Sequence, residues 1–379
     1  MKYNIKWLTP DRFDCKPDKS TWIEMTKSLI NYGHNVTILA SNKDKNTINQ
    51  QNTKQNIAYV NSLDFPFIFR LSVLVNMFFW LKKHASTNDI IIINQDALLL
   101  IPFLKVIGIN KIHLDIRTLP VDTHTVKDRL DKLLYWHIPL KLFARSTQGY
   151  SFITERLKQE LDKQYDMRVK HYTIWQSGVS TNTFYPKDLN ANKSDRFQLF
   201  YHGTISTNRG IGIVIEAIAL LDKSIPIEFV IIGTGSGLEE LKTLTKNLNL
   251  NDQVIFQGFM PYENMSEEIS KADICICPLT DRLEWNVSSP IKVFEYMACG
   301  KPMILTPIPA HKDVVSKVPY VIWTDGFKPE DFKNAIIKAI NSQDKLRESS
   351  KTAPEFVKTH YEWKHQAKKL ELYFSETFE

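Results

Sequence analysis

The stretch DICICPLTDRLEWNVSSPIKVFEYMACGKPMILTP, residues 273–307, contains the pattern that decides the fold. It begins with a short apolar run and ends in a second one. The segment between them carries residues that are typical of the beginning and the end of a helix. Ser289 suits a helix N-cap, Pro290 suits the first helical position, and Gly300 suits a left-handed C-terminal cap. Two apolar runs joined through a helix predict a βαβ unit of a parallel sheet.

The same alternation of apolar runs and helical segments extends along the chain. Continuous apolar runs are typical of strands that are buried on both faces of a parallel sheet. Strands that alternate with helices predict an α/β fold whose sheets are covered by helices on both faces. The other runs on which this prediction rests are NVTILA (35–40), DIIIIN (89–94), KIHLDIR (111–117), GYSFIT (149–154), FQLFYHG (197–203), IEFVIIG (227–233) and QVIFQG (253–258).

The length of 379 residues exceeds what one ordinary hydrophobic core accommodates, so we expect two domains. The stretch at 180–196 is polar and without periodicity, which favours a linker there. We therefore expect a first domain over 1–182 and a second over 196–361, with an amphipathic helix within 362–379 packing back onto the first. In doubly wound sheets, ligands bind outside the carboxyl ends of the strands.

Composition and charge exclude some function classes without identifying a partner. The net charge of +6 is modest for this length, and no familiar nucleic-acid motif is present. The four cysteines, Cys15, Cys275, Cys277 and Cys299, match no zinc signature. Because Cys275 and Cys277 fall in an apolar run, we expect core packing in a reducing compartment. The N-terminus lacks the apolar region of a signal peptide, which favours the cytoplasm.

Two hydrophobic and basic stretches leave a question open. Residues 65–84 read FPFIFRLSVLVNMFFWLKKH, and residues 129–146 read RLDKLLYWHIPLKLFARS. Arg70, Ser72 and Asn76 interrupt the first stretch, which argues against a membrane span. One interpretation is that both are helices packed against the sheet. The other is peripheral contact with a membrane surface, at its inner, cytoplasmic face.

Arg209 is the first candidate for binding an anion. It stands in YHGTISTNRGIG (201–212), where a predicted strand is followed by a loop and a helix. Gly203 allows a ligand to approach the backbone closely, and an arginine at a helix N-terminus pairs well with phosphate oxygens. The alternative is that Arg209 is simply solvated.

Lys292 and Glu295 are the next candidates, on the helix predicted in the opening stretch. Lys292 lies in the first turn, where the helix dipole disfavours a cation. One interpretation is an exposed Lys292–Glu295 ion pair worth only a few tenths of a kcal/mol. The other is a bound anion, with Lys292 neutralising a phosphate and Glu295 accepting hydrogen bonds from hydroxyls. A diphosphate attached to a ribose matches both roles.

Several common nucleotide and hydrolase signatures are absent from the sequence. The glycines at 233, 235 and 237 do not fit G-x-G-x-x-G, and no P-loop spacing occurs. There is no Asp-x-Asp to hold a metal-bound diphosphate and no Gly-x-Ser-x-Gly nucleophile elbow. A nicotinamide site and an elbow-type hydrolase are therefore disfavoured.

The second half of the chain resembles the nucleotide-sugar-binding domain of retaining GT-B glycosyltransferases, the family-four or group 1 type. SPIKVFE matches a Ser-Pro-x-Lys-x-x-Glu subset of that family. The resemblance implies two doubly wound Rossmann-like domains facing a central cleft. The runs that carry it are YHGTISTNRGIGIVIEAI, IEFVIIGTGSGLEEL, VIFQGFMPYENMSEEISKADICICPL and SSPIKVFEYMACGKPMILTPI, with YGHNVTILA, WQSGVSTNTFYP and EWKHQAKKLELYF.

The resemblance implies transfer of a sugar, with retention, from a nucleotide-diphosphate sugar to an acceptor hydroxyl. It implies no metal and no other cofactor, and a glycan or lipid-linked acceptor in polysaccharide, glycolipid or other glycoconjugate biosynthesis. Val287, Thr204 and Arg117 depart from residues common in the family. They keep open a catalytically silent GT-B scaffold subunit of a partner transferase. A nucleotide-sugar epimerase is a further alternative.

The resemblance also implies roles for single residues. Glu295 would bind the ribose hydroxyls, Arg209 and Lys292 would stabilise the departing diphosphate, and backbone near Phe259 and Met260 would approach the base. The other implied nucleotide-sugar contacts are Gly203, Thr204, Gly233, Gly235, Ser289 and Pro290.

Two first-domain residues complete the candidates. Asp115 and Arg117 stand at the end of a predicted strand, where the resemblance implies contacts to the sugar or the acceptor. The alternative is a purely structural Asp/Arg pair.

Overall fold

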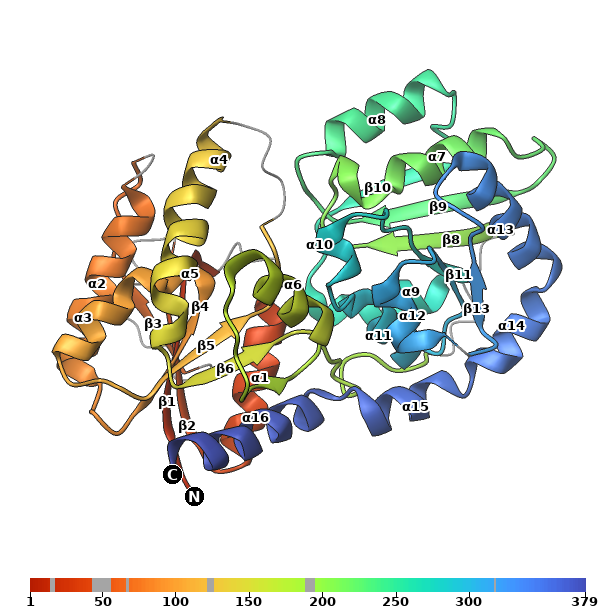
Figure 1. Cartoon of the computed structure of the whole chain (residues 1–379). Coiled ribbons are helices and arrows are strands. Elements are labelled where there is room, and N and C mark those ends of the chain that lie inside the picture. Colours follow the sequence, from red (N-terminus) through yellow and green to blue (C-terminus); the bar gives the residue numbers. More distant parts are fainter. Residues whose placement is uncertain (14–17, 43–55, 66–67, 121–125, 188–194, 317) are drawn as a thin grey trace. The chain divides into compact units, whose positions relative to one another are not determined.

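The computed structural model describes residues 1–13, 18–42, 56–65, 68–120, 126–187, 195–316 and 318–379, and of Lys127 the backbone only. Cys15 lies outside the described residues. The chain divides into two compact units, whose elements are labelled in Figure 1. Unit 1 comprises Met1–Gln176 with Trp363–Glu379, and unit 2 comprises Ser177–Glu362.

Unit 1 is built on a seven-stranded parallel sheet with the strand order β3-β2-β1-β4-β5-β6-β7. The order reverses at β1, which makes the sheet doubly wound. Its central strand β4 is a continuous run of four isoleucines, all fully buried, as expected for a strand covered on both faces. The strands are β1 (Asn4–Arg12), β2 (Asn35–Ser41), β3 (Ile57–Val60), β4 (Ile90–Asn94), β5 (Ile112–Ile116), β6 (Gly149–Phe152) and β7 (Thr173–Ile174).

The helices of unit 1 include the C-terminal helix of the chain. That helix, α16, packs on α1. Its Tyr373 hydroxyl accepts a hydrogen bond from the Tyr150 N–H at 3.0 Å, and its Glu371 lies 3.5 Å from His34 Nε2. The helical elements are α1 (Lys19–Asn31), α2 (Phe69–His84), η3 (Gln95–Leu100), α3 (Ile101–Val106), α4 (Val126–Lys132), η4 (Leu133–His137), α5 (Ile138–Phe143), η5 (Ala144–Ser146), α6 (Glu155–Tyr165) and α16 (Trp363–Phe378).

Unit 2 has a six-stranded parallel sheet with the order β10-β9-β8-β11-β12-β13. The order reverses between β8 and β11, so this sheet is doubly wound as well. The strands are β8 (Phe197–His202), β9 (Ile227–Ile232), β10 (Val254–Gly258), β11 (Ile274–Cys277), β12 (Met303–Leu305) and β13 (Val321–Trp323). The helical elements are η7 (Thr207–Arg209), α7 (Ile211–Ala219), α8 (Leu238–Asn247), η8 (Tyr262–Asn264), α9 (Met265–Lys271), α10 (Leu283–Asn286), α11 (Ile291–Ala298), α12 (Pro309–Val315), α13 (Pro329–Asn341), α14 (Gln343–Ser350) and α15 (Ala353–His360).

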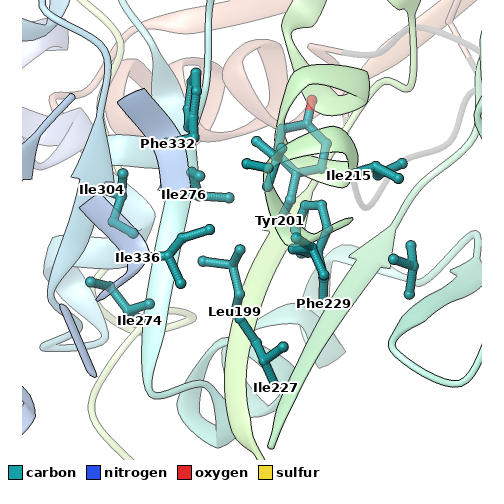
Figure 2. Packing of buried hydrophobic residues seen from close by; sticks show 14 of the residues in the cluster. Leu199, Tyr201, Ile215, Ile227, Phe229, Ile274, Ile276, Ile304, Phe332 and Ile336 are labelled. Atoms are coloured by element: carbon teal, nitrogen blue, oxygen red, sulfur yellow. The ribbon is translucent and has the colours of Figure 1, made fainter. Parts of the chain in front are cut away.

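The core of unit 2 lies between the sheet and helices α7 and α13. Figure 2 shows Leu199 and Tyr201 of β8 among buried side chains of β9, β11 and β12, with Phe332 and Ile336 contributed by α13. Tyr201 is fully buried, yet its hydroxyl donates to the Thr204 carbonyl at 2.9 Å. The ring therefore anchors the loop after β8 to the hydrophobic core.

The prediction of two doubly wound parallel sheets is confirmed. Each apolar run named above forms a strand, and Cys275 and Cys277 are buried on β11 as expected. The strands β3, β7 and β13 and the helices α12–α15 were not anticipated. Among the described residues, no helix combines the length and the apolar character needed to cross a membrane.

The predicted cap of helix α11 is wrong. The helix begins at Ile291, Pro290 occupies the N-cap position, and Ser289 precedes it. The Ser289 hydroxyl accepts from the Ser177 N–H at 3.1 Å, and the Ser289 carbonyl accepts from the Ser177 hydroxyl at 2.8 Å. Ser289 is thus engaged by a segment distant in sequence. The left-handed Gly300 at the other end, with φ +66°, is confirmed.

Candidate functional site

The candidate site lies where the strand order of unit 2 reverses. The loop after β8 leads to η7 and α7, and the segment after β11 leads to α10 and α11. β8 and β11 are neighbours in the sheet, and in doubly wound sheets a crevice forms at such a point, outside the carboxyl ends of the strands. Gly203, Arg209, Lys292 and Glu295 all belong to these two connections. The sheet topology therefore brings the predicted anion-binding residues to one place.

Lys292 lies directly over the backbone of Gly203. Gly203 has φ +119°, and a Cβ built on it would stand 2.5 Å from Lys292 Cε and 2.7 Å from its Nζ. The ammonium lies 5.4 Å from the centroid of the Tyr201 ring, within the range of a cation–π contact. Any side chain at 203 would displace the lysine. Gly203 is thus needed for Lys292 to adopt this position.

Arg209 is placed by the short turn η7 and by helix α10. Its Cζ lies 4.5 Å from the centroid of the Trp285 ring. The carbonyl of Asn208 accepts hydrogen bonds from Thr280 Oγ1 at 3.0 Å and from Trp285 Nε1 at 3.1 Å. These bonds fix the turn against the segment after β11. The guanidinium is therefore held from two sides of the crevice.

The two cations of the crevice influence each other. Burial, and then repulsion from Arg209, lower the pKa of Lys292 from 10.5 to about 8. Within the described part of the chain, no ion pair joins either cation to a carboxylate. Arg209 Nε is also buried without a hydrogen-bond acceptor there. Two partly buried cations without anionic partners make a site suited to a ligand with more than one negative charge.

Glu295 is buried, and among the described residues it forms no ion pair with Lys292. It is 3% exposed, and its Oε2 lies 3.2 Å from His202 Nε2. The interpretation of Lys292 and Glu295 as an exposed ion pair is therefore wrong. His202 was missed as a candidate, although a histidine at the end of the otherwise apolar run FQLFYHG was an available signal.

Gly233 and Gly235 have a packing role. A Cβ on Gly233 would lie 1.9 Å from the Gly203 carbonyl oxygen, and one on Gly235 would lie 2.0 Å from that of Ile205. The Ile205 N–H donates to the Thr234 carbonyl at 2.9 Å. The loop after β9 thus packs backbone to backbone on the loop after β8. Both glycines preserve the shape of the crevice wall.

The other predicted nucleotide-sugar contacts lie at the carboxyl ends of the same sheet. Phe259, which is 78% exposed, and the partly exposed Met260 follow β10. The carbonyl of Gly258 before them accepts from the Gly233 N–H at 2.7 Å. Thr204 is partly exposed after β8, and Ser289 and Pro290 are buried before α11.

Asp115 and Arg117 belong to unit 1 and are engaged there. Asp115 accepts hydrogen bonds from Ser151 Oγ at 2.6 Å and from Trp175 Nε1 at 3.0 Å. Burial raises its pKa to about 6, against the opposing effect of Arg117. The Arg117 guanidinium lies 3.4 Å from the Trp175 ring centroid and donates to the Trp175 carbonyl at 2.9 Å. These contacts give both residues a structural role in unit 1.

Among the described residues, no set of three or more His, Cys, Asp or Glu side chains is placed to hold a metal ion.

Comparison with protein families identifies the domain that carries the crevice. Residues 184–356 match the family described as "Glycosyl transferases group 1". This part of the chain is similar to group 1 glycosyl transferase domains. It contains β8 to β13 and the candidate residues Gly203, Arg209, Lys292 and Glu295.

Three relatives show how far sequence similarity extends. An uncharacterized glycosyltransferase of Methanocaldococcus jannaschii, MJ1069, is 26% identical over 50% of this chain and 47% of its own. The putative glycosyltransferase YtcC of Bacillus subtilis is 23% identical over 58% of each chain. Mannosylfructose-phosphate synthase of Agrobacterium fabrum is 22% identical over 55% of this chain and 49% of its own. The chain thus spans about half the length of these curated relatives.

Solved structures match over nearly the whole chain. Sucrose-phosphate synthase from Thermosynechococcus elongatus aligns with a TM-score of 0.82 at 14% identity, covering 99% of both chains. Anabaena Alr3699/HepE, in complex with UDP and glucose, aligns with a TM-score of 0.76 at 14% identity, covering 98% of this chain and 99% of that one. At these identities the likeness establishes the fold. It confirms the GT-B fold class.

The packing role of Gly233 can be tested against a second glycine. Gly258 also has positive φ, +77°, but a Cβ on it would meet nothing within 4 Å. We expect Gly233→Ala to lower the free energy of unfolding by about 1–3 kcal/mol more than Gly258→Ala, because it adds overpacking to backbone strain. Urea unfolding measures both losses. Equal losses would contradict the backbone packing described above.

The His202–Glu295 pair can be tested with a double-mutant cycle. Removing one partner leaves the other buried and poorly paired, so His202→Leu and Glu295→Leu should each cost about 1–3 kcal/mol. The double variant should lose less than the sum, with a coupling of about 0.5–3 kcal/mol in the free energy of unfolding. Strict additivity would show that the two side chains do not stabilise each other.

Proposed function

We propose that the chain transfers a sugar from a nucleotide-diphosphate sugar to an acceptor hydroxyl, with retention of anomeric configuration. The observation that carries the proposal is the pair of cations, Arg209 and Lys292, without anionic partners at the switch point of a domain similar to group 1 glycosyl transferases. A diphosphate supplies the negative charge that this crevice lacks. Solved neighbours of the same fold include HepE with UDP-glucose and TarM with UDP.

Arg209 and Lys292 would act on the leaving group. As the bond between the anomeric carbon and the diphosphate oxygen breaks, its electron pair moves to that oxygen. The acceptor hydroxyl attacks from the same face, and its proton passes to the departing diphosphate. Preorganised cations stabilise the charge that develops on the leaving group more than they stabilise the bound donor. In this proposal no metal or other cofactor is required.

The remaining residues would position the nucleotide and its ribose. Glu295 would accept hydrogen bonds from the ribose hydroxyls, and His202 would hold its carboxylate in place. Backbone near Phe259 and Met260 would approach the base. The loop residues Gly203, Thr204, Gly233 and Gly235, with Ser289 and Pro290 before α11, would shape the diphosphate site.

The acceptor in this proposal is a glycan or a lipid-linked glycan. The reaction would serve polysaccharide, glycolipid or other glycoconjugate biosynthesis in the cytoplasm. Asp115 and Arg117, at the carboxyl end of β5 in unit 1, are the proposed sugar or acceptor contacts. Their hydrogen bonds to Ser151 and Trp175 would keep them in position.

The leaving-group role is tested by removing each cation. Loss of one such donor typically costs about 10²–10³ in rate, so Arg209→Ala and Lys292→Ala should each slow donor turnover on that scale. A thermal-shift screen with UDP-, GDP-, ADP- and TDP-sugars selects the donor, because ligand binding raises the unfolding temperature. Release of the nucleoside diphosphate then measures turnover.

Exposed cations of the same unit supply the control. Lys351 and Lys242 are exposed and pair with Glu348 and Glu239, so Lys351→Ala and Lys242→Ala should keep wild-type rates. Near-wild-type turnover in both cation variants of the crevice would overturn the assignment.

The depressed pKa of Lys292 gives a second, independent readout. With a pKa of about 8, Lys292 is mostly neutral in the free protein at pH 8.5. A bound diphosphate favours the ammonium, so binding at this pH should take up a proton and weaken as the pH rises. Calorimetry of UDP binding in two buffers of different ionisation enthalpy measures that uptake. Lys292→Ala should abolish it, and uptake that persists in this variant would assign the proton to another group.

A further inference from the structure

Helix α2 presents an apolar face to solvent. Its inner face, with Leu74, Met77 and Leu81, is buried against the unit 1 sheet. The outer face of such a helix is normally polar. Here it consists of the exposed Ile68, Leu71, Val75 and Phe79, which follow one another at helical spacing.

The segment α4–η4–α5 also exposes apolar side chains to solvent. Trp136 and Leu140 are buried on its inner side. Its outer side carries exposed apolar residues at helical spacing: Val126, Leu130, Leu133, Leu134, Ile138 and Leu142.

Side-chain contacts join the two segments into one surface. Arg70 of α2 lies 5.2 Å from the centroid of the Tyr135 ring of η4, and it pairs with Asp96 of η3 at 3.1 Å. Phe103 of α3, 57% exposed, lies 5.9 Å from Phe78 of α2. Figure 1 shows α2, α3, α4 and α5 gathered on one side of unit 1. We call the exposed apolar residues of these helices, with the cations beside them, the apolar–basic face.

The charge of the chain is concentrated in the same two segments. Residues 65–84 contain three Lys or Arg and no Asp or Glu, and residues 126–146 contain five Lys or Arg and two Asp. Each segment is thus +3 in the sequence, and together they equal the net charge of +6 of the whole chain. Two of these cations pair with carboxylates outside the segments, Arg70 with Asp96 and Arg145 with Asp166. Lys82 and Lys83 at the end of α2 and Lys141 in α5 are exposed among the apolar residues.

We propose that the apolar–basic face docks on an anionic lipid bilayer. A bilayer interface buries apolar side chains while the flanking lysines and arginines meet anionic headgroups. A second copy of this chain is a poorer occupant, because a symmetric dimer through this face would bring the exposed lysines of the two copies together. The inference goes beyond sugar transfer and does not depend on it, since docking needs neither donor nor acceptor.

Vesicle binding by the full chain tests the proposal. We expect the chain to co-sediment with vesicles of phosphatidylcholine mixed with phosphatidylglycerol, and to bind vesicles of phosphatidylcholine alone at least about tenfold more weakly. Binding to the mixed vesicles should weaken with added salt, because the screening length is only about 10 Å at 0.1 M. Absence of binding to the mixed vesicles at low salt would overturn the proposal.

Two sets of substitutions separate the apolar and the basic contributions. Replacing Leu133, Leu134, Ile138 and Leu142 together by Gln should weaken binding about a hundredfold or more, since a fully inserted leucine is worth roughly tenfold in partitioning. Lys82→Gln with Lys83→Gln should weaken binding to the anionic vesicles by about fivefold per residue. All six side chains are exposed, so the unfolding temperature should remain unchanged.

A matched control uses exposed leucines elsewhere on the chain. Leu220 after α7 and Leu372 of α16 are 44% and 51% exposed and lie outside the face. Leu220→Gln with Leu372→Gln should bind vesicles as the wild type does. An equal loss in this control would contradict a specific docking surface. Sedimentation velocity tests the other occupant: a dimer of the wild type that the four apolar substitutions dissociate would make this face an interface between copies and overturn the proposal.

Discussion

The contact between Lys292 and the backbone of Gly203 is the constraint on which the candidate site depends. It joins the loop after β8 to helix α11, the two connections that flank the reversal of strand order in unit 2. Gly203 must lack a side chain for the lysine to lie there, and its carbonyl in turn leaves no room for a side chain at Gly233. The Tyr201 hydroxyl ties the same loop to the core through Thr204. The position of one ammonium group is thus fixed by close backbone packing across three consecutive strands of the sheet.

The features that were predicted correctly from the sequence depend on local patterns of residues. The features that were missed depend on contacts between residues that are distant in the chain. Buried parallel strands are continuous apolar runs, so most strands could be predicted from local pattern. β7, with only two residues, was too short to stand out. Arg209 and Lys292 were identified because charges beside helix starts are a local signal. The cap assigned to Ser289 was wrong because its hydrogen-bond partner, Ser177, lies far away in the chain. The packing of Gly233 on Gly203 is likewise a contact between separate loops, which no local pattern reveals.

Glu295 shows how burial changes the meaning of a charged residue. From the sequence it was either one half of a surface ion pair or a ligand for hydroxyls. A carboxylate that is 3% exposed needs a polar partner, since an unpaired buried charge is strongly destabilising. The group placed to be that partner is His202 at the end of β8, whose Nε2 lies 3.2 Å from Glu295 Oε2. In the proposed function, the same pair that stabilises the fold would orient a carboxylate toward the ribose. The position of the Glu295 carboxylate and the stability of the fold would then both depend on the contact between His202 and Glu295.

The value of the net charge alone identified no partner. The distribution of the charged residues along the chain is more informative. The two helical segments of the apolar–basic face account for the whole +6, so the remainder of the chain, including the candidate site, is neutral on balance. The positive character of the crevice therefore comes from two cations, Arg209 and Lys292, that lie there without carboxylate partners among the described residues. Burial, and then repulsion from Arg209, lower the pKa of Lys292. The positive character of the apolar–basic face comes from exposed lysines such as Lys82, Lys83 and Lys141 on an extended surface. The first arrangement suits a small, highly charged ligand, and the second suits an extended anionic surface, because long-range attraction scales with net charge whereas recognition at short range depends on geometry.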